Sequence, residues 1–335
     1  APTDQMTEPF TVSTPIQDVI DDPIFGRYGR LLFPVDDWYM SGDTLGELQL
    51  TWYNNIDPNE TVEIVNTLWQ RANAGETVFY DIYTEEEKAE DPDKADTGLF
   101  FFKGDPGAKF AVCNAGGGFA YVGAMQDSCP HALEISKRGY NAFALIYRPG
   151  AQTACEDLAR AISFIFEHAE ELEVDTKGYS LWGGSAGARM AAWLGSYGPA
   201  AFGGDDLPQP SAVIMQYTGH SDYTENDPPT FACVGERDGI ANWRTMQRRI
   251  DDLQITLMNR LLLDFRNEGA QNIFTDHFNQ FWISYQLLDG VEIFDLVDKT
   301  GHFSGSIRRQ LTALIVVDFI PVVFLWIMAC SNNDS

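Results

Sequence analysis

Short apolar runs alternate with longer segments of helical spacing along most of the chain. Eight such runs are bounded by glycine, proline or polar residues: TVFYDIY, LFFFK, KFAVCNA, NAFALIY, YSLWGG, SAVIMQY, TFACVG and VEIFDLV. Most of the later runs are continuously hydrophobic, as strands covered on both faces must be. This order predicts an α/β protein with a doubly wound, mostly parallel, eight-stranded sheet.

The same pattern divides the chain into regions. Residues 1–50 are rich in Pro, Asp and Gly without sustained periodicity, which predicts an irregular N-terminal arm packed on a main domain of residues 51–335. The acidic run from Glu85 to Asp96 predicts a solvated loop, because like charges repel. Within 253–289, two amphipathic segments predict a helical insertion before the last strand.

A hydrophobic helix is expected over residues 306–330. Its apolar part, 311–330, approaches the length of a membrane span, but Asp318 and Pro321 lie in its middle. A central Asp costs about 3 kcal/mol in a membrane helix. The segment is therefore interpreted as the last helix of the domain, packed on the sheet, with a membrane anchor as the alternative.

The charge balance narrows the choice of partners. Lys and Arg number 22 against 49 Asp and Glu, a net charge of −27, which repels nucleic acid and anionic lipid headgroups. Five cysteines without CxxC or metal-ligand spacing predict buried free thiols and no metal site. The opening APTDQM, without an initiator Met, is compatible with a cytoplasmic protein and slightly favours a processed, secreted form.

One serine has a distinctive setting. Ser185 lies in the GxSxG sequence of residues 183–187, directly after a strand-like run and before helix-like ARMAAWLGSY. A nucleophile elbow needs this spacing, because the strained turn tolerates no bulk two residues to either side. A small-residue turn that only lets helix and strand pack closely is the alternative.

Three consecutive glycines, 116–118, follow the run KFAVCNA. Without Cβ atoms, such a segment can turn backbone N–H groups toward a developing negative oxygen. The amides of Gly117, Gly118 and Ala186 are the candidates for an oxyanion hole. A phosphate cradle is the alternative, although no GK[ST] follows.

Together, NAGGGF and GGSAG resemble the α/β-hydrolase fold, in particular its bacterial esterase/lipase branch with an HGGG-type oxyanion loop. Ala115 stands where that loop has histidine, so other groups must support the loop here. The resemblance implies a triad acid at Asp238, after the run TFACVG, with Glu236 and Asp222 as fallback acids. It covers about residues 40–250, and its motifs are specific for the fold and the reaction class but indicate the substrate only poorly.

The base is expected after the acid in the chain. His277 has the more usual spacing from Asp238, whereas His302 follows the run VEIFDLV in a Gly-His-Phe sequence that resembles the family's last loop. We favour His302, because the base must leave a strand end and an inserted helix costs only loop length. His277 is the alternative base.

These residues predict a serine carboxylesterase with a Ser-His-Asp triad and an acyl-enzyme, and without metal or cofactor. The resemblance suggests short acyl groups, such as acetyl, on a small-molecule or saccharide alcohol. Phe119, Tyr217 and His220 are possible pocket residues, while His131 and His168 are expected to be surface or helix-packing residues. A peptidase or amidase, or a non-catalytic binding protein of the same fold, remains the alternative.

Overall fold

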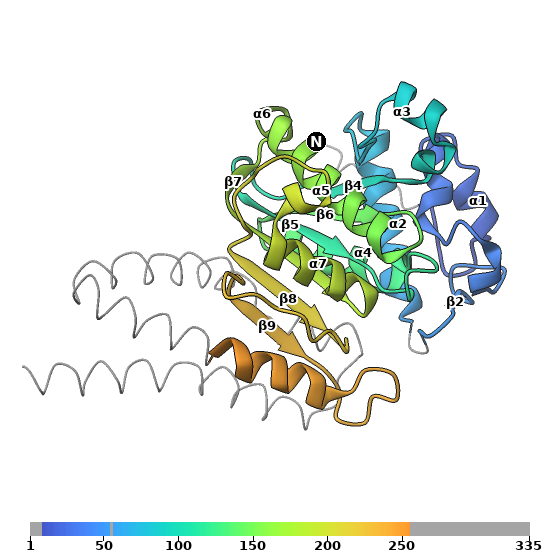
Figure 1. Cartoon of the computed structure of the whole chain (residues 1–335). Helices are drawn as coiled ribbons and strands as arrows, with labels where there is room; N and C mark the ends of the chain where they lie inside the picture. Colours follow the sequence, from blue (N-terminus) through green and yellow to red (C-terminus); the bar gives the residue numbers. More distant parts are fainter. Residues whose placement is uncertain (1–8, 54–55, 255–335) are drawn as a thin grey trace, which may run out of the picture.

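A seven-stranded sheet forms the centre of the computed structural model, which describes residues 9–53 and 56–254 (Figure 1). Its strand order is β3-β4-β6-β5-β7-β8-β9. The strands are β3 (Phe79–Tyr80), β4 (Gly98–Phe102), β5 (Lys109–Asn114), β6 (Asn141–Ile146), β7 (Asp175–Gly184), β8 (Ala212–Gln216) and β9 (Thr230–Cys233). β4 is antiparallel to β3 and β6, and the other neighbouring strands are parallel.

The predicted fold class is therefore confirmed. Seven of the eight predicted runs form strands at the expected places, although the first forms only the two residues of β3. The eighth run, 291–297, lies outside the described residues. So do the C-terminal helix expected over 306–330 and, apart from its first two residues, the insertion expected over 253–289.

Helices cover both faces of the sheet. Within the described residues they are α1 (Ile16–Ile20), α2 (Pro58–Asn73), α3 (Glu85–Glu90), α4 (Ser128–Lys137), α5 (Ala151–Glu167), α6 (Ala169–Leu172) and α7 (Ala186–Tyr197). Short 3-10 helices are η1 (Gly26–Leu32), η2 (Asp37–Tyr39), η3 (Pro92–Asp96), η4 (Ala124–Gln126) and η5 (Pro199–Phe202), and residues 243–254 are also helical. α2 and α4 share one apolar core with the sheet, and α5 and α7 share the other.

Alternate side chains of each strand enter opposite cores, because successive residues of a strand point to opposite faces. In β4, Phe100 and Phe102 belong to the core with α2 and α4, whereas Phe101 belongs to the core with α5 and α7. There Phe101 stacks on Phe143 with ring centroids 4.5 Å apart, and Phe110 meets Phe143 edge to face. Since both faces are covered, strands such as β4 and β6 are buried along their whole length, whereas the first residues of β7 are polar and partly exposed.

The N-terminal residues pack against the face that carries α2. Phe10 is buried, and its backbone N–H and carbonyl both hydrogen-bond with the Asn66 side chain of α2, at 3.1 and 2.9 Å. Farther along, β1 (Met40–Ser41) and β2 (Gln49–Leu50) form a separate two-stranded sheet. Buried residues of this segment, including Phe25, Leu32 and Leu45, join the core with α2 and α4.

The acidic run is not the loop predicted from its charge: it forms α3 and η3. Thr84 Oγ1 accepts from the Glu87 N–H at 3.2 Å, and a Glu87 carboxylate oxygen accepts from the Thr84 N–H at 2.8 Å. This capping box satisfies two backbone donors at the helix start. Glutamates in the first turn are also favourable beside the helix N-terminus, which offsets their mutual repulsion.

All four cysteines in the described residues are free and buried, as expected: Cys113, Cys129, Cys155 and Cys233. Burial raises the pKa of each thiol, to about 12 for Cys129 and Cys155. Cys330 lies outside the described residues. Among the helices within residues 9–254 none is long and apolar enough to cross a membrane, and the segment 311–330 falls outside that range.

The Phe143 side chain is expected to be a main contributor to stability. Its replacement in Phe143→Ala leaves a cavity between Phe101 and Phe110, and should lower the free energy of unfolding by about 3–5 kcal/mol in urea titrations. Trp38 is 84% exposed, so Trp38→Ala should cost less than about 0.5 kcal/mol. Equal losses for the two variants would contradict this core assignment.

Candidate active site

Four neighbouring parallel strands end at one edge of the sheet. Asn114 at the end of β5 pairs with Gly183 of β7, Gly184 pairs with Gln216 of β8, and Gln216 pairs with Cys233 of β9. The segments that follow these strands hold the triple glycine, the serine, Tyr217 to His220, and Asp238. Ligand sites of open α/β sheets lie at such carboxyl ends.

Ser185 occupies a strained turn between β7 and α7. Its φ of 52° and ψ of −115° are rare for a residue with a Cβ, and cost on the order of 1–3 kcal/mol. The turn is held by a hydrogen bond of 2.9 Å from the Ser185 N–H to the Gln216 carbonyl. Gly184 and Ala186 are buried, whereas Ser185 is partly exposed, so the turn leaves the serine accessible.

The glycines around the serine are required by close backbone contacts. A Cβ on Gly183 would lie 2.2 Å from the Gly187 carbonyl carbon, and a Cβ on Gly187 would lie 2.0 Å from the Asn114 carbonyl oxygen. No side chain fits at such distances. The GxSxG spacing therefore reflects the approach of α7 to β7 and to the end of β5 in this turn.

The triple-glycine segment lies directly beside the serine. A Cβ on Gly116 would be 3.0 Å from the Ser185 Cβ. Gly117 and Gly118 have φ values of 133° and 64°, which glycine adopts at little cost. Among the hydrogen bonds of the described residues, none uses the N–H of Gly117 or Gly118. The segment thus has donors available next to Ser185.

A buried carboxylate supports this segment. Asp127, which is 1% exposed, accepts a hydrogen bond of 2.7 Å from the Gly116 N–H at its Oδ2. The same oxygen accepts from the Tyr53 hydroxyl at 2.8 Å, and the Tyr217 hydroxyl also hydrogen-bonds with Asp127. Burial and the neighbouring carboxylate raise the pKa of both tyrosines well above its ordinary value, so both hydroxyls keep their protons.

The segment after β6 holds the other side of the glycine loop. The Tyr147 hydroxyl donates to the Ala115 carbonyl at 2.5 Å, and the Gly150 N–H donates to the Phe119 carbonyl at 2.8 Å. Ala115 stands where the loop that the sequence resembles has histidine. Here the Tyr147 hydroxyl and the Asp127 carboxylate support the segment instead.

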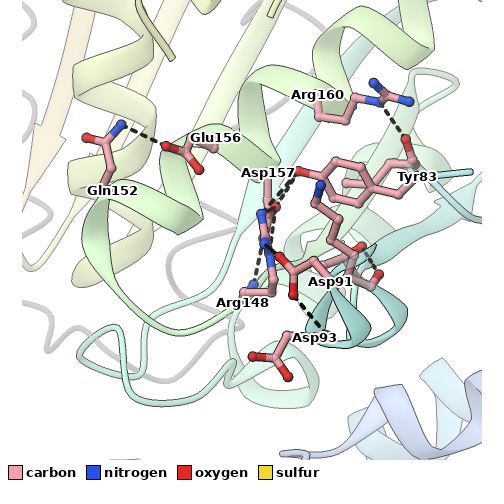
Figure 2. A network of polar contacts seen from close by, with 11 residues as sticks. Tyr83, Asp91, Asp93, Arg148, Gln152, Glu156, Asp157 and Arg160 are labelled. Atoms are coloured by element: carbon pink, nitrogen blue, oxygen red, sulfur yellow. Dashed lines mark hydrogen bonds and ion pairs between the residues drawn. The ribbon is translucent and has the colours of Figure 1, made fainter. Parts of the chain in front are cut away.

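An ion-pair network fixes the segment after β6 (Figure 2). Arg148 Nη2 lies 2.7 Å from Oδ1 of Asp157, which is fully buried in α5, and Arg148 Nε donates to the same carboxylate. Asp157 also accepts from the Arg148 backbone N–H at 2.8 Å and from the Tyr83 hydroxyl at 2.6 Å, while Arg148 Nη1 reaches Asp91 at 2.7 Å. This charge-assisted network anchors Arg148, the residue after Tyr147, to α5.

Asp238 lies in the turn after β9. Its Oδ1 accepts from the N–H groups of Ile240 and Ala241, both at 2.8 Å, and its own N–H donates to the Gly235 carbonyl at 3.1 Å. These bonds fix the orientation of the carboxylate. Among the described residues, the structure gives its Oδ2 no hydrogen bond, so that oxygen can still accept one.

Three of the five histidines lie in the described part of the chain. Nδ1 of His131, in α4, lies 2.6 Å from the Asp127 carbonyl oxygen, and His168 follows the last residue of α5 and stacks on Phe164. Both are helix-packing residues, as expected. The two candidate bases, His277 and His302, lie outside the described residues.

His220 is buried, and within the part of the chain that the structure describes its Nε2 has no hydrogen-bond partner. Burial, together with the positive charges of Arg249 and Arg189, lowers its pKa to about 4, so the ring is neutral near pH 7. Its ring meets Trp193 edge to face at 5.1 Å, and Trp193 also stacks with Phe119 at 6.3 Å.

Two of the possible pocket residues, Phe119 and His220, thus contact the same tryptophan, Trp193. Tyr217 is different, because its hydroxyl lies with Asp127 behind the serine turn, where a Cβ on Gly184 would be 2.2 Å from it. No group of three or more His, Cys, Asp or Glu side chains within the described ranges could hold a metal ion.

The sequence interpretation missed the groups that support the loop. Asp127 is the one acidic residue in the stretch YVGAMQDSCPHAL, and that isolation was a usable signal. Tyr53 and Tyr147 had no such signal, because aromatic residues in and beside apolar runs are usually core residues.

The strand order, the strained serine at the end of β7 and the glycine loop after β5 define an α/β-hydrolase fold. Residues 104–205, less than a third of the chain, match the model of the BD-FAE family, an α/β-hydrolase-like esterase family. A search of curated proteins finds no match.

Similar solved structures include esterase 2 of Thermogutta terrifontis phosphorylated by paraoxon, at 20% identity and a TM-score of 0.43, covering 49% of this chain and 75% of that one. The propionate-bound form of the Thermogutta terrifontis esterase has 21% identity and a TM-score of 0.42, covering 49% and 76%. MGS-M1, an α/β hydrolase from a Medee basin deep-sea metagenome library, has 18% identity and a TM-score of 0.43, covering 58% and 93%.

The strain at Ser185 predicts an unusual order of variant stabilities. The free energy of unfolding of Ser185→Gly should be about 1 kcal/mol higher than that of Ser185→Ala, because glycine adopts a positive φ at little cost. At Ser163, in the interior of α5, the order should reverse, since glycine costs about 1 kcal/mol relative to alanine in a helix. Chemical denaturation measures both pairs, and the same order at the two sites would argue against strain at Ser185.

Proposed function

We propose that this protein is a serine hydrolase that cleaves carboxylic esters, with Ser185 as the nucleophile. The supporting observation is the positive φ of Ser185 in a glycine-lined turn at the carboxyl edge of a parallel sheet. The strained backbone at Ser185 costs free energy, and a turn that only packs a helix on a strand would not need it. The match of residues 104–205 to an esterase family model supports the same reaction.

In the proposed first step, Ser185 Oγ attacks the ester carbonyl carbon and gives its proton to an imidazole. The carbonyl oxygen becomes an oxyanion, which accepts hydrogen bonds from the N–H groups of Gly117, Gly118 and Ala186. Two observations support this choice of donors. The glycine loop lies beside the serine, and α7 begins at Ala186, where helix N–H groups have no acceptor within the helix.

Collapse of this intermediate breaks the bond to the leaving alcohol, which takes the proton from the imidazolium and departs. Water then attacks the acyl-enzyme through the same sequence of proton transfers and releases the acid. Asp238 would orient the imidazole and stabilise its charged form through Oδ2, because Oδ1 is already used by two backbone amides. This route requires neither a metal nor a cofactor.

We assign the base to His302, with His277 as the alternative. The assignment rests on the Gly-His-Phe sequence after the last apolar run, from which an imidazole could reach the sheet edge that carries Ser185.

The proposed substrates are short-chain acyl esters, such as acetyl esters, of a small-molecule or saccharide alcohol. An exposed Trp52 indole supports a flat leaving group, because a Cβ on Gly118 would lie 3.0 Å from that ring. Phe119 and His220, which flank Trp193, would line a second part of the site with one neutral polar atom, Nε2.

Loss of the nucleophile provides the primary test. Ser185→Ala should lower the rate of p-nitrophenyl acetate hydrolysis at least about 10³-fold and abolish labelling by a fluorophosphonate. Ser196→Ala, which removes a buried hydroxyl from α7, should leave both unchanged. Ser185-dependent cleavage of a p-nitroanilide at a comparable rate would instead indicate an amidase, and an unlabelled wild-type protein would indicate a non-catalytic member of the fold.

The base assignment is tested by paired variants. His302→Ala should lower kcat for p-nitrophenyl acetate about 10³-fold, because no other group would accept the Ser185 proton, and His277→Ala should stay within about threefold of wild type. The opposite result would move the base to His277, and two small effects would exclude both.

A further inference from the structure

Asp127 is a buried carboxylate to which the proposed reaction assigns no role. It lies between η4 and α4, with 1% of its surface exposed, and its Oδ2 receives hydrogen bonds from the Gly116 N–H and the Tyr53 hydroxyl. The Tyr217 hydroxyl also hydrogen-bonds with this carboxylate. Because a buried charge is costly unless it is fully hydrogen-bonded, its presence here calls for a specific use.

The three donors come from segments far apart in the chain. Tyr53 precedes α2, Gly116 begins the glycine loop after β5, and Tyr217 follows β8. Asp127 therefore ties the glycine loop to two other segments through a single side chain. Both tyrosines have a pKa raised well above its ordinary value, chiefly by burial, so neither can become an anion that repels Asp127.

The Gly116 hydrogen bonds also set the direction of the next donor. Its N–H is held by Asp127 at 2.7 Å, and its carbonyl accepts from the Gly123 N–H at 2.9 Å. The Gly116 carbonyl and the Gly117 N–H belong to one planar trans peptide unit, so they point in opposite directions. Fixing the carbonyl toward Gly123 therefore fixes the Gly117 N–H on the other side of the loop.

We propose that Asp127 is the positioning residue of the oxyanion loop. Its carboxylate holds the Gly116 N–H, and Gly116 thereby keeps its carbonyl toward Gly123 and the Gly117 N–H oriented before the substrate binds. This inference rests on the proposed function of Ser185 and extends it to a residue that does not touch the substrate. A preoriented amide stabilises the oxyanion without reorganisation during the reaction, which is the main source of its effect on rate.

A carboxylate suits this role better than a neutral side chain. Charge-assisted hydrogen bonds are shorter and stronger than neutral ones, and one carboxylate oxygen can accept from several donors. An asparagine in the same position could still accept from Gly116 through its carbonyl oxygen, but more weakly. The His131 Nδ1 atom lies 3.8 Å from Oδ1, and the hydrogen bonds that the carboxylate accepts come from the Gly116 N–H and two tyrosine hydroxyls.

The test compares Asp127→Asn and Asp127→Ala with the wild type in two measurements. In p-nitrophenyl acetate hydrolysis, normalised to folded protein, Asp127→Ala should lower kcat about 100-fold and Asp127→Asn about tenfold, with KM within threefold. In hydrogen-deuterium exchange, the peptide covering residues 115–123 should exchange faster in both variants. Asp127→Asn keeps the test informative if the alanine variant does not fold.

Asn66→Ala is the matched control. Asn66 is a buried polar residue of α2 that also holds backbone groups, those of Phe10, and within the described residues its side chain makes no hydrogen bond with the glycine loop. It should lose stability, yet keep kcat within threefold and leave exchange of residues 115–123 unchanged. Such a result separates positioning of the loop from general destabilisation.

The outcomes distinguish this inference from the proposed function. A wild-type protein without Ser185-dependent hydrolysis would reject the proposed function, and exchange of residues 115–123 would then decide on its own whether Asp127 holds the loop. Unchanged exchange in Asp127→Ala would overturn the inference in every case. If the wild-type enzyme is active, a kcat of Asp127→Ala within threefold of the wild-type value would also overturn it.

Discussion

The backbone at Ser185 is the constraint on which the rest of the site depends. A residue with a Cβ held at φ 52° persists only when its surroundings leave no relaxed alternative. Here β7 and α7 converge so closely that Gly183 and Gly187 nearly touch, and the Ser185 N–H is bonded to the end of β8. The packing of sheet and helix thus supplies the energy that keeps one serine raised above the sheet edge.

Much of this arrangement follows from local sequence. A continuously hydrophobic run cannot expose either face, so runs such as NAFALIY had to become strands with helices on both sides. The serine turn was equally predictable, because GxSxG between a strand and a helix has few other physical solutions. In contrast, charge alone misjudged the stretch from Glu85: a capping box at Thr84 and Glu87 outweighs repulsion among side chains that water can screen.

The support of the glycine loop could not be predicted in the same way. Tyr53, Asp127 and Tyr217 are separated by more than 70 residues at each step, and nothing in their local sequences indicates that they meet. Such contacts arise from the tertiary fold, in which the ends of β5 and β8 and the segment before α2 converge. The sequence pointed to a loop without its usual histidine, and only the fold shows that a carboxylate and Tyr147 hold it instead.

The buried thiols have a consequence for handling the protein. Cys113, Cys129, Cys155 and Cys233 are enclosed in the two cores, and burial keeps their pKa values far above neutral pH. Because the thiolate is the form that attacks an alkylating reagent, these four sulfurs react only when the surrounding core opens. The rate at which iodoacetamide alkylates each thiol therefore reports how often the core on that face of the sheet opens by local unfolding.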